Sequence, residues 1–429
     1  MQIVIALPDE ERSTVETPIC GVPLLTRVIS AAIRAGGSSV LLLAPPGWPL
    51  RWLSQLLKSQ PIESVFVEAE EFAWRFDPEK TEHWQAAADR LEERFVWIPY
   101  DYIPHKAPLA ELLETAKSHP GSPVSYCLAS GSIFERPAVL LRRQVVSGDL
   151  TAFGAVPVIT GQPGVSARQP AVIKGVEAEL VRRSGKVTDG IFSTFNRMLC
   201  RPAVRWLTHT PVTPNMVSFA GLGIALLAGL CFAENTWAWN VFGAALFFLS
   251  GLFDEIDGML ARLTFRESPF GCWLETMADY ASYLLIFAGM AIGGYRRGGW
   301  VYLVIGAALL FGCVLSFAVI SVQRKLAAPA NRPNEYSRLY LEALDRDARN
   351  PISRLVRQLQ FLTKKGVLIH YLLVFAIVGV LPVVLFLCAV GANIAWMVTI
   401  YFNRRLFSSK QRRSVELKSV APAVAELKQ

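Results

Sequence analysis

The sequence has little of what several common kinds of functional site require. Its seven cysteines are scattered and form no CxxC pair, which argues against a zinc site or a disulfide framework. Only 18% of the residues are charged, and the formal charge of +8 is not accompanied by stretches that interleave basic and aromatic side chains. A nucleic-acid-binding surface would need such stretches, so no nucleic acid is expected as a partner. The first residues lack the basic segment of a signal peptide, and we expect the N-terminal part to stay in the cytoplasm.

Apolar residues are abundant instead. Hydrophobic residues make up 52% of the 429 residues and the mean hydropathy is +0.34, which indicates several membrane-spanning helices. The long apolar runs begin only near residue 212. We therefore expect four parts: a cytoplasmic α/β domain over residues 1–185, a linker over 186–211, a membrane domain over 212–408 and a cytoplasmic tail over 409–429.

The first part has the pattern of a parallel α/β sheet. Two short apolar runs, Ile3–Leu7 and Val40–Leu43, flank an amphipathic segment, Pro23–Ala35, that Gly36 and Gly37 terminate. This order predicts a strand, a helix and a second strand, a unit that is typical of parallel sheets. Further strands are predicted at Phe95–Pro99 and Val139–Val146.

The later part predicts a six-helix transmembrane bundle. Thr213 precedes Pro214, which is the usual order at a helix N-terminus. Each predicted span is near the ~20 residues that a bilayer requires, except a short fifth one. The spans are Asn215–Ala233, Trp237–Arg262, Gly271–Gly294, Trp300–Val322 and two within Val367–Phe402, separated near Gly379–Pro382.

Basic residues set the expected orientation. The segment Gln323–Gly366 and the tail that begins at Arg404 are rich in Lys and Arg, so they and both termini are expected in the cytoplasm. Arg296 and Arg297 fall on the opposite side and break this rule. The linker segment Ile191–Leu207 has apolar residues at helical spacing with arginines between them, which predicts an interfacial helix.

Acidic residues stand at the junction of the second and third spans. Asp254, Asp257, Gly258 and Ala261 share one helix face, and Gly271, Glu275 and Asp279 share one face of the next helix. Carboxylates beside membrane-spanning segments are costly and mark functional sites by default. Four of them in a small space need cations to neutralise them, and oxygen ligands suit Mg²⁺ or Mn²⁺.

This pattern resembles the signature of the CDP-alcohol phosphotransferase family, D-x2-D-G-x2-A-R-x8-G-x3-D-x3-D. The match runs from Asp254 to Asp279 and includes Arg262. One position departs from the family pattern, because Glu275 stands in place of the third Asp. Its side chain keeps the carboxylate but reaches farther by roughly 1.5 Å, one C–C bond length.

The resemblance implies the reaction and the residues that perform it. The family moves a substituted phosphate from a CDP-alcohol to a second alcohol and releases CMP. Two metal ions, Mg²⁺ or Mn²⁺, would be held by the four acids, with Asp279 also the base that deprotonates the acceptor. Arg262 would meet a phosphate of the CDP group, while Gly258, Ala261 and Gly271 would leave room for the nucleotide. For a phosphorylated acceptor, Arg324 and Lys325 are candidates, although both are equally explained as positive-inside anchors. A homodimer is also implied.

The N-terminal part resembles the nucleotidyltransferase fold through Gly21–Arg27 and Ala35–Gly36. The glycine-rich loop of that fold is missing, because Asp9, Glu10 and Glu11 stand there and would repel a triphosphate. Asp101 is a weak metal-ligand candidate. We therefore expect a nucleotidyltransferase-like domain without catalytic activity. The whole layout resembles the inositol-1-phosphate cytidylyltransferase/di-myo-inositol phosphate phosphate synthase fusions.

Two other classes of function remain open from the sequence. A transporter would also place carboxylates in membrane helices, though usually near the midplane on broken helices. A non-catalytic membrane scaffold would explain both the altered Glu275 and the missing N-terminal loop. Neither the donor, CDP-diacylglycerol or a soluble CDP-polyol, nor the acceptor follows from the sequence.

Overall fold

The computed structural model describes two compact units. The described residues are 1–8, 12–46, 48, 66–71, 76–126, 133–148, 156–158, 164–167, 170–185, 190–327 and 365–400. The first unit comprises Met1–Ser184 together with two later segments, Arg201–Pro211 and Met259–Arg266. The second unit comprises Gly185–Cys200, Val212–Gly258 and the chain from Glu267 onward.

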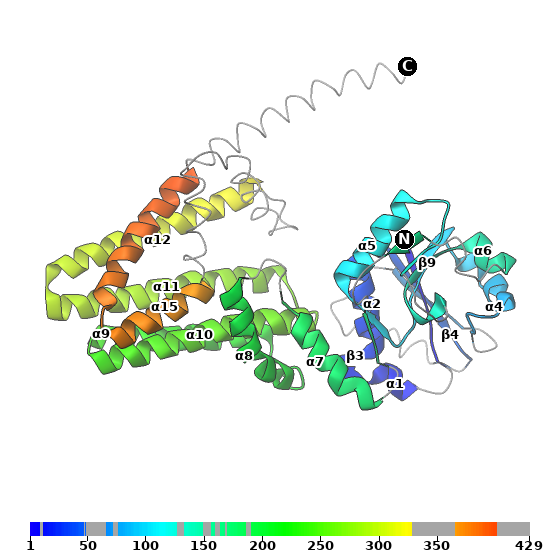
Figure 1. Ribbon diagram of the computed structural model, residues 1–429, viewed down its shortest axis with the longest axis horizontal. Coiled ribbons are helices and arrows are strands. Elements are labelled where there is room, and N and C mark those ends of the chain that lie inside the picture. Colours follow the sequence, from blue (N-terminus) through cyan, green and yellow to red (C-terminus); the bar gives the residue numbers. More distant parts are fainter. Residues whose placement is uncertain are drawn as a thin grey trace, which may run out of the picture. The chain divides into compact units, whose positions relative to one another are not determined.

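The first unit is built on a seven-stranded sheet (Figure 1). In spatial order the strands are β10 (Val156–Val158), β8 (Val124–Tyr126), β9 (Ala138–Leu141), β6 (Arg94–Trp97), β1 (Gln2–Ala6), β4 (Ser39–Ala44) and β5 (Phe66–Glu71). Strand β1 is parallel to both of its neighbours, β4 and β6, whereas β9 is antiparallel to both of its own, β6 and β8. Two small ribbons pair β2 (Pro18–Ile19) with β3 (Val22–Pro23) and β7 (Tyr102–Pro104) with β11 (Gly164–Ser166).

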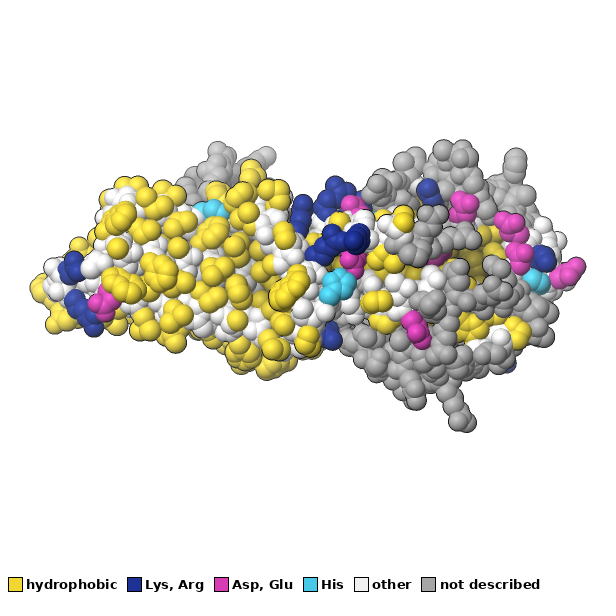
Figure 2. All heavy atoms as spheres, turned by 90° about the horizontal axis from the view of Figure 1, so that it is seen from below, with side chains coloured by type: hydrophobic (Ala, Val, Ile, Leu, Met, Phe, Trp, Pro, Cys, Tyr) yellow, Lys and Arg dark blue, Asp and Glu magenta, His cyan; other side chains and the backbone are white. Residues whose placement is uncertain are grey.

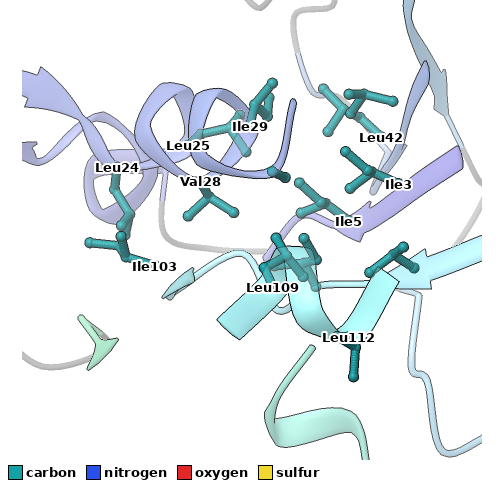
Figure 3. Packing of buried hydrophobic residues seen from close by; sticks show 14 of the residues in the cluster. Ile3, Ile5, Leu24, Leu25, Val28, Ile29, Leu42, Ile103, Leu109 and Leu112 are labelled. Carbon is teal, nitrogen blue, oxygen red and sulfur yellow. The ribbon is translucent and has the colours of Figure 1, made fainter. Parts of the chain in front are cut away.

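Both faces of the sheet are buried, as expected where helices cover a largely parallel sheet. Alternate residues of β1 enter different clusters, Ile3 and Ile5 on one face and Val4 on the other. Figure 3 shows the first cluster, where Val28 and Ile29 of α2 (Leu24–Ala35) lie toward the strands. The described helices of this unit are α1 (Arg12–Glu16), α2 (Leu24–Ala35), α4 (Thr81–Ala86), α5 (Lys106–Ser118), α6 (Arg142–Ser147) and α7 (Ile173–Arg183).

The predicted first strand, helix and second strand are confirmed as β1, α2 and β4, with β1 parallel to β4. The predicted strand Val139–Val146 is wrong in its second half. The strand ends at Leu141, and Arg142–Ser147 form helix α6. The polar run from Arg142 to Gln144 ends the apolar stretch, and Gly148 at φ 87° then terminates the helix in the left-handed conformation that suits glycine.

The second unit holds the apolar helices (Figure 1). Thr213 caps α9 (Pro214–Glu234) and accepts a hydrogen bond from the Met216 N–H, with Pro214 in the first turn, as predicted. Gly229 of α9 and Gly289 of α11 (Pro269–Gly298) allow close packing, because a Cβ on Gly289 would lie 2.0 Å from the Gly229 carbonyl oxygen. The helices are α9 (Pro214–Glu234), α10 (Trp237–Leu263), α11 (Pro269–Gly298), α12 (Trp300–Ala327), α15 (Lys365–Val378) and Leu381–Ile400.

All six predicted spans are helical, but the six-span bundle is confirmed only in part. Within the described residues, four helices are long and apolar enough to cross a membrane: α9, α11, the Trp300–Val322 part of α12, and Leu381–Ile400. Helix α10 carries four charged residues near its C-terminal end, and α15 has only 14 residues. The predicted linker helix is confirmed as α8 (Ile191–Leu207), whose exposed apolar residues include Ile191 and Trp206.

The outer surface of the second unit is apolar. Hydrophobic side chains cover most of the left half of the picture in Figure 2, where the few charged side chains lie at the far-left end and toward the middle. Only 17% of the most apolar window of α12 and 22% of that of Leu381–Ile400 are buried within the protein. Such surface is suited to lipid, so the protein is a membrane protein.

Arg296 has a local reason to break the positive-inside pattern. Its guanidinium donates to the Ala233 carbonyl oxygen at 3.2 Å and to the Glu234 carboxylate at 3.4 Å. It therefore satisfies backbone and side-chain acceptors at the C-terminal end of α9. This position is explained by helix capping, whatever the orientation of the chain.

Candidate active site

The acidic residues of the motif lie on two helices. Asp254 and Asp257 are in the C-terminal half of α10, and Glu275 and Asp279 are in the N-terminal half of α11. The start of α11 is fixed by Ser268, whose hydroxyl oxygen accepts the Gly271 N–H at 2.9 Å, and by Pro269 in the first turn. A Cβ on Gly271 would lie 3.1 Å from that hydroxyl oxygen, so this end of the helix is tightly packed.

Asp257 is the most buried of the four acids, with 4% of its surface exposed. The Ser218 hydroxyl of α9 donates a hydrogen bond to its carboxylate. Asp257 is also within electrostatic range of Asp254, Glu275 and Asp279. Asp257 therefore lies within electrostatic range of the other three predicted metal ligands, and Ser218 of a third helix donates to it.

Lys365, the first residue of α15, lies between two of these acids. Its ammonium nitrogen is 2.6 Å from the Asp279 carboxylate and 3.7 Å from that of Asp254, and its side chain is only 9% exposed. A buried ammonium of this kind requires charged partners, and the two carboxylates supply them. The sequence places Lys365 in a basic segment, where it is indistinguishable from an orientation anchor.

Helix α8 positions both α10 and α15. Arg197 pairs with Glu255 at 2.9 Å, and both side chains are largely buried. The Asn196 side-chain amide donates to the Gly366 carbonyl oxygen at 3.3 Å, one residue after Lys365. The His370 ring packs against Phe192 and Phe248, as expected for a packing residue. The helix predicted as a linker therefore also holds the elements that carry Asp254 and Lys365.

The predicted CDP-binding residues lie on two helices, α10 and α11. Gly258 and Ala261 follow the two acids on α10, and Gly271 opens α11. Arg262 belongs to the first unit, where its Nε donates to the Ser184 carbonyl oxygen at 2.7 Å. The predicted acceptor residues Arg324 and Lys325 lie in the last turn of α12, but their side chains fall outside the described part.

The four acids have the type of ligand atom that suits a divalent cation. Carboxylate oxygens are the ligands that Mg²⁺ and Mn²⁺ prefer. A positive charge, the Lys365 ammonium, already lies between Asp254 and Asp279. Across the described residues, no three His, Cys, Asp or Glu side chains converge as a ready-made metal site. Lys365 thus pairs with two of the four acids.

The N-terminal candidate residues are less informative. The Asp101 carboxylate accepts a hydrogen bond from the Ser166 hydroxyl at 3.2 Å, in the turn that leads into β7. Asp9, Glu10 and Glu11 lie outside the described residues, so the predicted loss of the phosphate loop stays a prediction. Among the described residues, Cys20, Cys200 and Cys231 are buried free thiols.

Comparison with known proteins identifies the part of the chain that carries the acids. Residues 211–342 match the family model of CDP-alcohol phosphatidyltransferase. We refer to this matched part as the phosphatidyltransferase domain. The resemblance predicted from the motif is therefore confirmed.

Relatives of the phosphatidyltransferase domain are named as synthases. Phosphatidylinositol phosphate synthase of Cutibacterium acnes is 32% identical over 120 residues, which cover 27% of this chain and 56% of that protein. Archaetidylinositol phosphate synthase of Pyrococcus horikoshii is 35% identical over 91 residues, which cover 21% of this chain and 47% of that protein.

A third relative matches beyond the phosphatidyltransferase domain. The bifunctional IPC transferase and DIPP synthase of Aquifex aeolicus is 23% identical over 293 residues, 66% of this chain and 62% of that protein. The match of 293 residues is longer than the part of the chain that follows position 210, so it extends into the N-terminal part. The chain spans about half to three fifths of the length of these three relatives. A solved structure, HddC from Yersinia pseudotuberculosis, aligns at 14% identity and a TM-score of 0.32, covering 42% of this chain and 98% of HddC.

Proposed function

We propose that the chain transfers a substituted phosphate from a CDP-alcohol to a second alcohol and releases CMP. One observation supports this proposal: the acids of α10 and α11, three of which lie within electrostatic range of Asp257, fall in the part of the chain that matches this family. A CDP-alcohol brings a pyrophosphate, and the reaction gathers negative charge on it. The site provides acids that bind cations and a helix start with little side-chain bulk.

Asp254, Asp257, Glu275 and Asp279 are the residues that would hold two Mg²⁺ or Mn²⁺ ions. When bound, such ions stabilise negative charge on the attacking and leaving oxygens. The Ser218 hydroxyl donates to Asp257 and keeps its carboxylate oriented. Asp279, whose carboxylate lies 2.6 Å from the Lys365 ammonium, is proposed to accept the proton of the incoming hydroxyl. Arg262 is proposed to meet a phosphate of the CDP group.

The names of the relatives support a phosphorylated acceptor. One is called phosphatidylinositol phosphate synthase, another archaetidylinositol phosphate synthase, and the third a bifunctional IPC transferase and DIPP synthase. We propose an inositol phosphate or a similar phosphorylated polyol as the acceptor, and either CDP-diacylglycerol or a soluble CDP-polyol as the donor. Arg324 and Lys325, at the end of α12, are candidates for binding the acceptor phosphate.

The remaining parts of the proposal concern the rest of the chain. The N-terminal domain, residues 1–185, is proposed not to synthesise the CDP-alcohol, because acids replace its phosphate loop. The chain is proposed to lie in the cytoplasmic membrane as a homodimer, with both termini in the cytoplasm. Helix α8 is proposed to lie in the interface, since its exposed side chains include Ile191, Met198 and Trp206.

The test is a reaction panel with purified full-length protein. The protein is incubated with CDP-diacylglycerol or CDP-polyols, with inositol phosphate or glycerol phosphate, and with Mg²⁺ or Mn²⁺, and CMP is measured. We expect CMP release that requires both substrates and stops when the metal is chelated. A transporter or a scaffold, the two other classes considered, would release no CMP from any pair.

A further inference from the structure

Helix α10, which carries the first half of the acidic motif, ends in a conformation that its sequence does not favour. The Arg266 N–H donates to the Ala261 carbonyl oxygen at 3.0 Å, and the Thr264 N–H donates to that of Leu260 at 2.9 Å. The first bond is that of a Schellman motif, which needs a left-handed residue after the helix and usually has glycine there. Here the residue is Phe265, with φ 58°. A bulky residue in this region is strained and persists only if its surroundings hold it.

Two arginines of α2 hold this end, and both belong to the same compact unit as residues 259–266. The Arg27 guanidinium donates to the Leu263 carbonyl oxygen at 2.7 Å, an acceptor that the helix itself leaves unpaired. The Arg34 guanidinium donates to the Phe265 carbonyl oxygen at 3.3 Å. The guanidinium carbons of Arg27 and Arg34 lie 5.2 Å and 4.7 Å from the centre of the Phe265 ring. These distances are within the range of cation–π contacts.

The Arg27 side chain is buried within the N-terminal domain and is not an exposed surface side chain. It is 2% exposed, and burial lowers its pKa to about 10. Its guanidinium also donates to the carbonyl oxygens of Ile19 at 3.0 Å and Cys20 at 3.4 Å. One planar cation therefore joins the β2–β3 turn to the last turn of α10, which a flexible ammonium could not do with the same geometry.

A second helix of the domain holds the same turn. The Ser184 carbonyl oxygen, at the end of α7, accepts the Nε–H of Arg262 at 2.7 Å. Helix α7 is itself tied to the β2–β3 turn, because Glu177 accepts the Cys20 N–H at 2.9 Å. The last turn of α10 is thus held from two helices of the N-terminal domain.

We propose that Arg27 is a positioning residue for the motif. Its hydrogen bond to Leu263 holds the C-terminal end of α10 on the N-terminal domain. Because the helix is continuous, this contact also fixes the register of Asp254 and Asp257. This proposal rests on the function proposed above only for its effect on activity. The N-terminal domain is expected to catalyse no reaction of its own. This proposal gives it a role in the reaction of the membrane domain. It also accounts for a phenylalanine at a position where glycine would be free of strain.

The experiment is hydrogen–deuterium exchange on the full-length protein in detergent, followed at the Thr264 and Arg266 amides. Arg27→Met is expected to raise exchange at both amides at least tenfold and to lower kcat about tenfold, with little change in KM. Arg27→Lys, which keeps a buried cation, is expected to give a rise of about threefold. In a Phe265→Gly background, where the left-handed turn no longer needs support, Arg27→Met should raise exchange less than threefold.

Arg94→Met is the matched control. Arg94 also donates to helix-end carbonyl oxygens, those of Ala116 and His119, but it lies on β6 and contacts α5. It should leave exchange at Thr264 and Arg266 and the value of kcat unchanged. Unchanged exchange in Arg27→Met, or equal increases in Arg27→Met and Arg94→Met, would overturn the proposal. If Arg27→Met does not fold, Arg27→Lys decides, and unchanged exchange in that variant overturns it. The exchange result does not depend on CMP release, so failure of the proposed reaction would be recognised separately.

Discussion

Replacing Lys365 by methionine is expected to strengthen divalent-metal binding and to lower the free energy of unfolding of the metal-free protein. The ammonium lies 2.6 Å from Asp279 and 3.7 Å from Asp254, and the two acids are 30% and 23% exposed. Breaking a buried ion pair by removing one partner costs about 3–5 kcal/mol. Because both acids are partly exposed, we expect the lower end, a loss of about 3 kcal/mol of metal-free stability.

The same free energy should appear in metal binding with the opposite sign. A divalent ion that binds the wild-type acids must replace the ammonium, whereas in Lys365→Met the acids are already uncompensated. Since about 1.4 kcal/mol corresponds to tenfold in affinity, a difference of about 3 kcal/mol predicts Mn²⁺ binding roughly a hundredfold tighter. Thermal unfolding of the variant should accordingly recover when Mn²⁺ is added.

The measurements are Mn²⁺ titration by electron paramagnetic resonance and thermal unfolding with and without metal. Arg296→Met is the control, since Arg296 pairs with Glu234 at 3.4 Å in an exposed ion pair on the same helix α11. Exposed pairs contribute about 0–1 kcal/mol, so this variant should bind Mn²⁺ like the wild type. Equal or weaker Mn²⁺ binding by Lys365→Met would refute the view that lysine and metal compete for Asp254 and Asp279.

Three further outcomes are expected. Glu275→Asp should keep activity and shift the preference between Mg²⁺ and Mn²⁺, whereas Glu275→Ala should lose most activity; full activity in the alanine variant would remove Glu275 from the metal site. Full-length Asp279→Asn, given CTP, Mg²⁺ and sugar, inositol or glycerol phosphates, should release no pyrophosphate, and steady release would make the N-terminal domain an enzyme. Burial lowers the pKa of His105 to about 4, so its neutral form is favoured in the folded state. Below pH 6.5 the unfolded chain gains the proton first, and stability should fall from pH 6.5 to 4. The unfolding midpoint of His105→Gln should vary less over this range, and an unchanged pH dependence would contradict this assignment.

Much of the architecture follows from local patterns in the sequence. Thr213 with Pro214 and Ser268 with Pro269 are strong helix-start signals, and α9 and α11 begin there. The spacing of Asp254 and Asp257 fixes them on one helix face, because helical geometry relates residues that are near in sequence. The predicted strand Val139–Val146 was wrong after Leu141. The chain changes from strand to helix at the polar residues that begin with Arg142, and a prediction from the apolar residues alone does not detect this change.

The parts that were missed depend on contacts between distant residues. Lys365 and Asp279 are 86 residues apart, and no local pattern marks one basic residue among many as the one that enters the site. The contact of Arg27 with Leu263 spans 236 residues, and nothing near Arg27 in the sequence indicates a helix end as its partner. Ser218 likewise looks like an ordinary small residue of an apolar helix until it lies against Asp257.

The most direct test of the proposed reaction is CMP release by full-length Asp279→Asn, with Glu234→Gln as a matched control. Glu234 is an exposed carboxylate at the end of α9 and has no part in the motif. Under metal and substrate conditions that support the wild type, Asp279→Asn should release CMP about a thousandfold more slowly, within the range expected for loss of a catalytic base. Glu234→Gln should match the wild type. Wild-type rates of CMP release from Asp279→Asn would contradict the proposed reaction site.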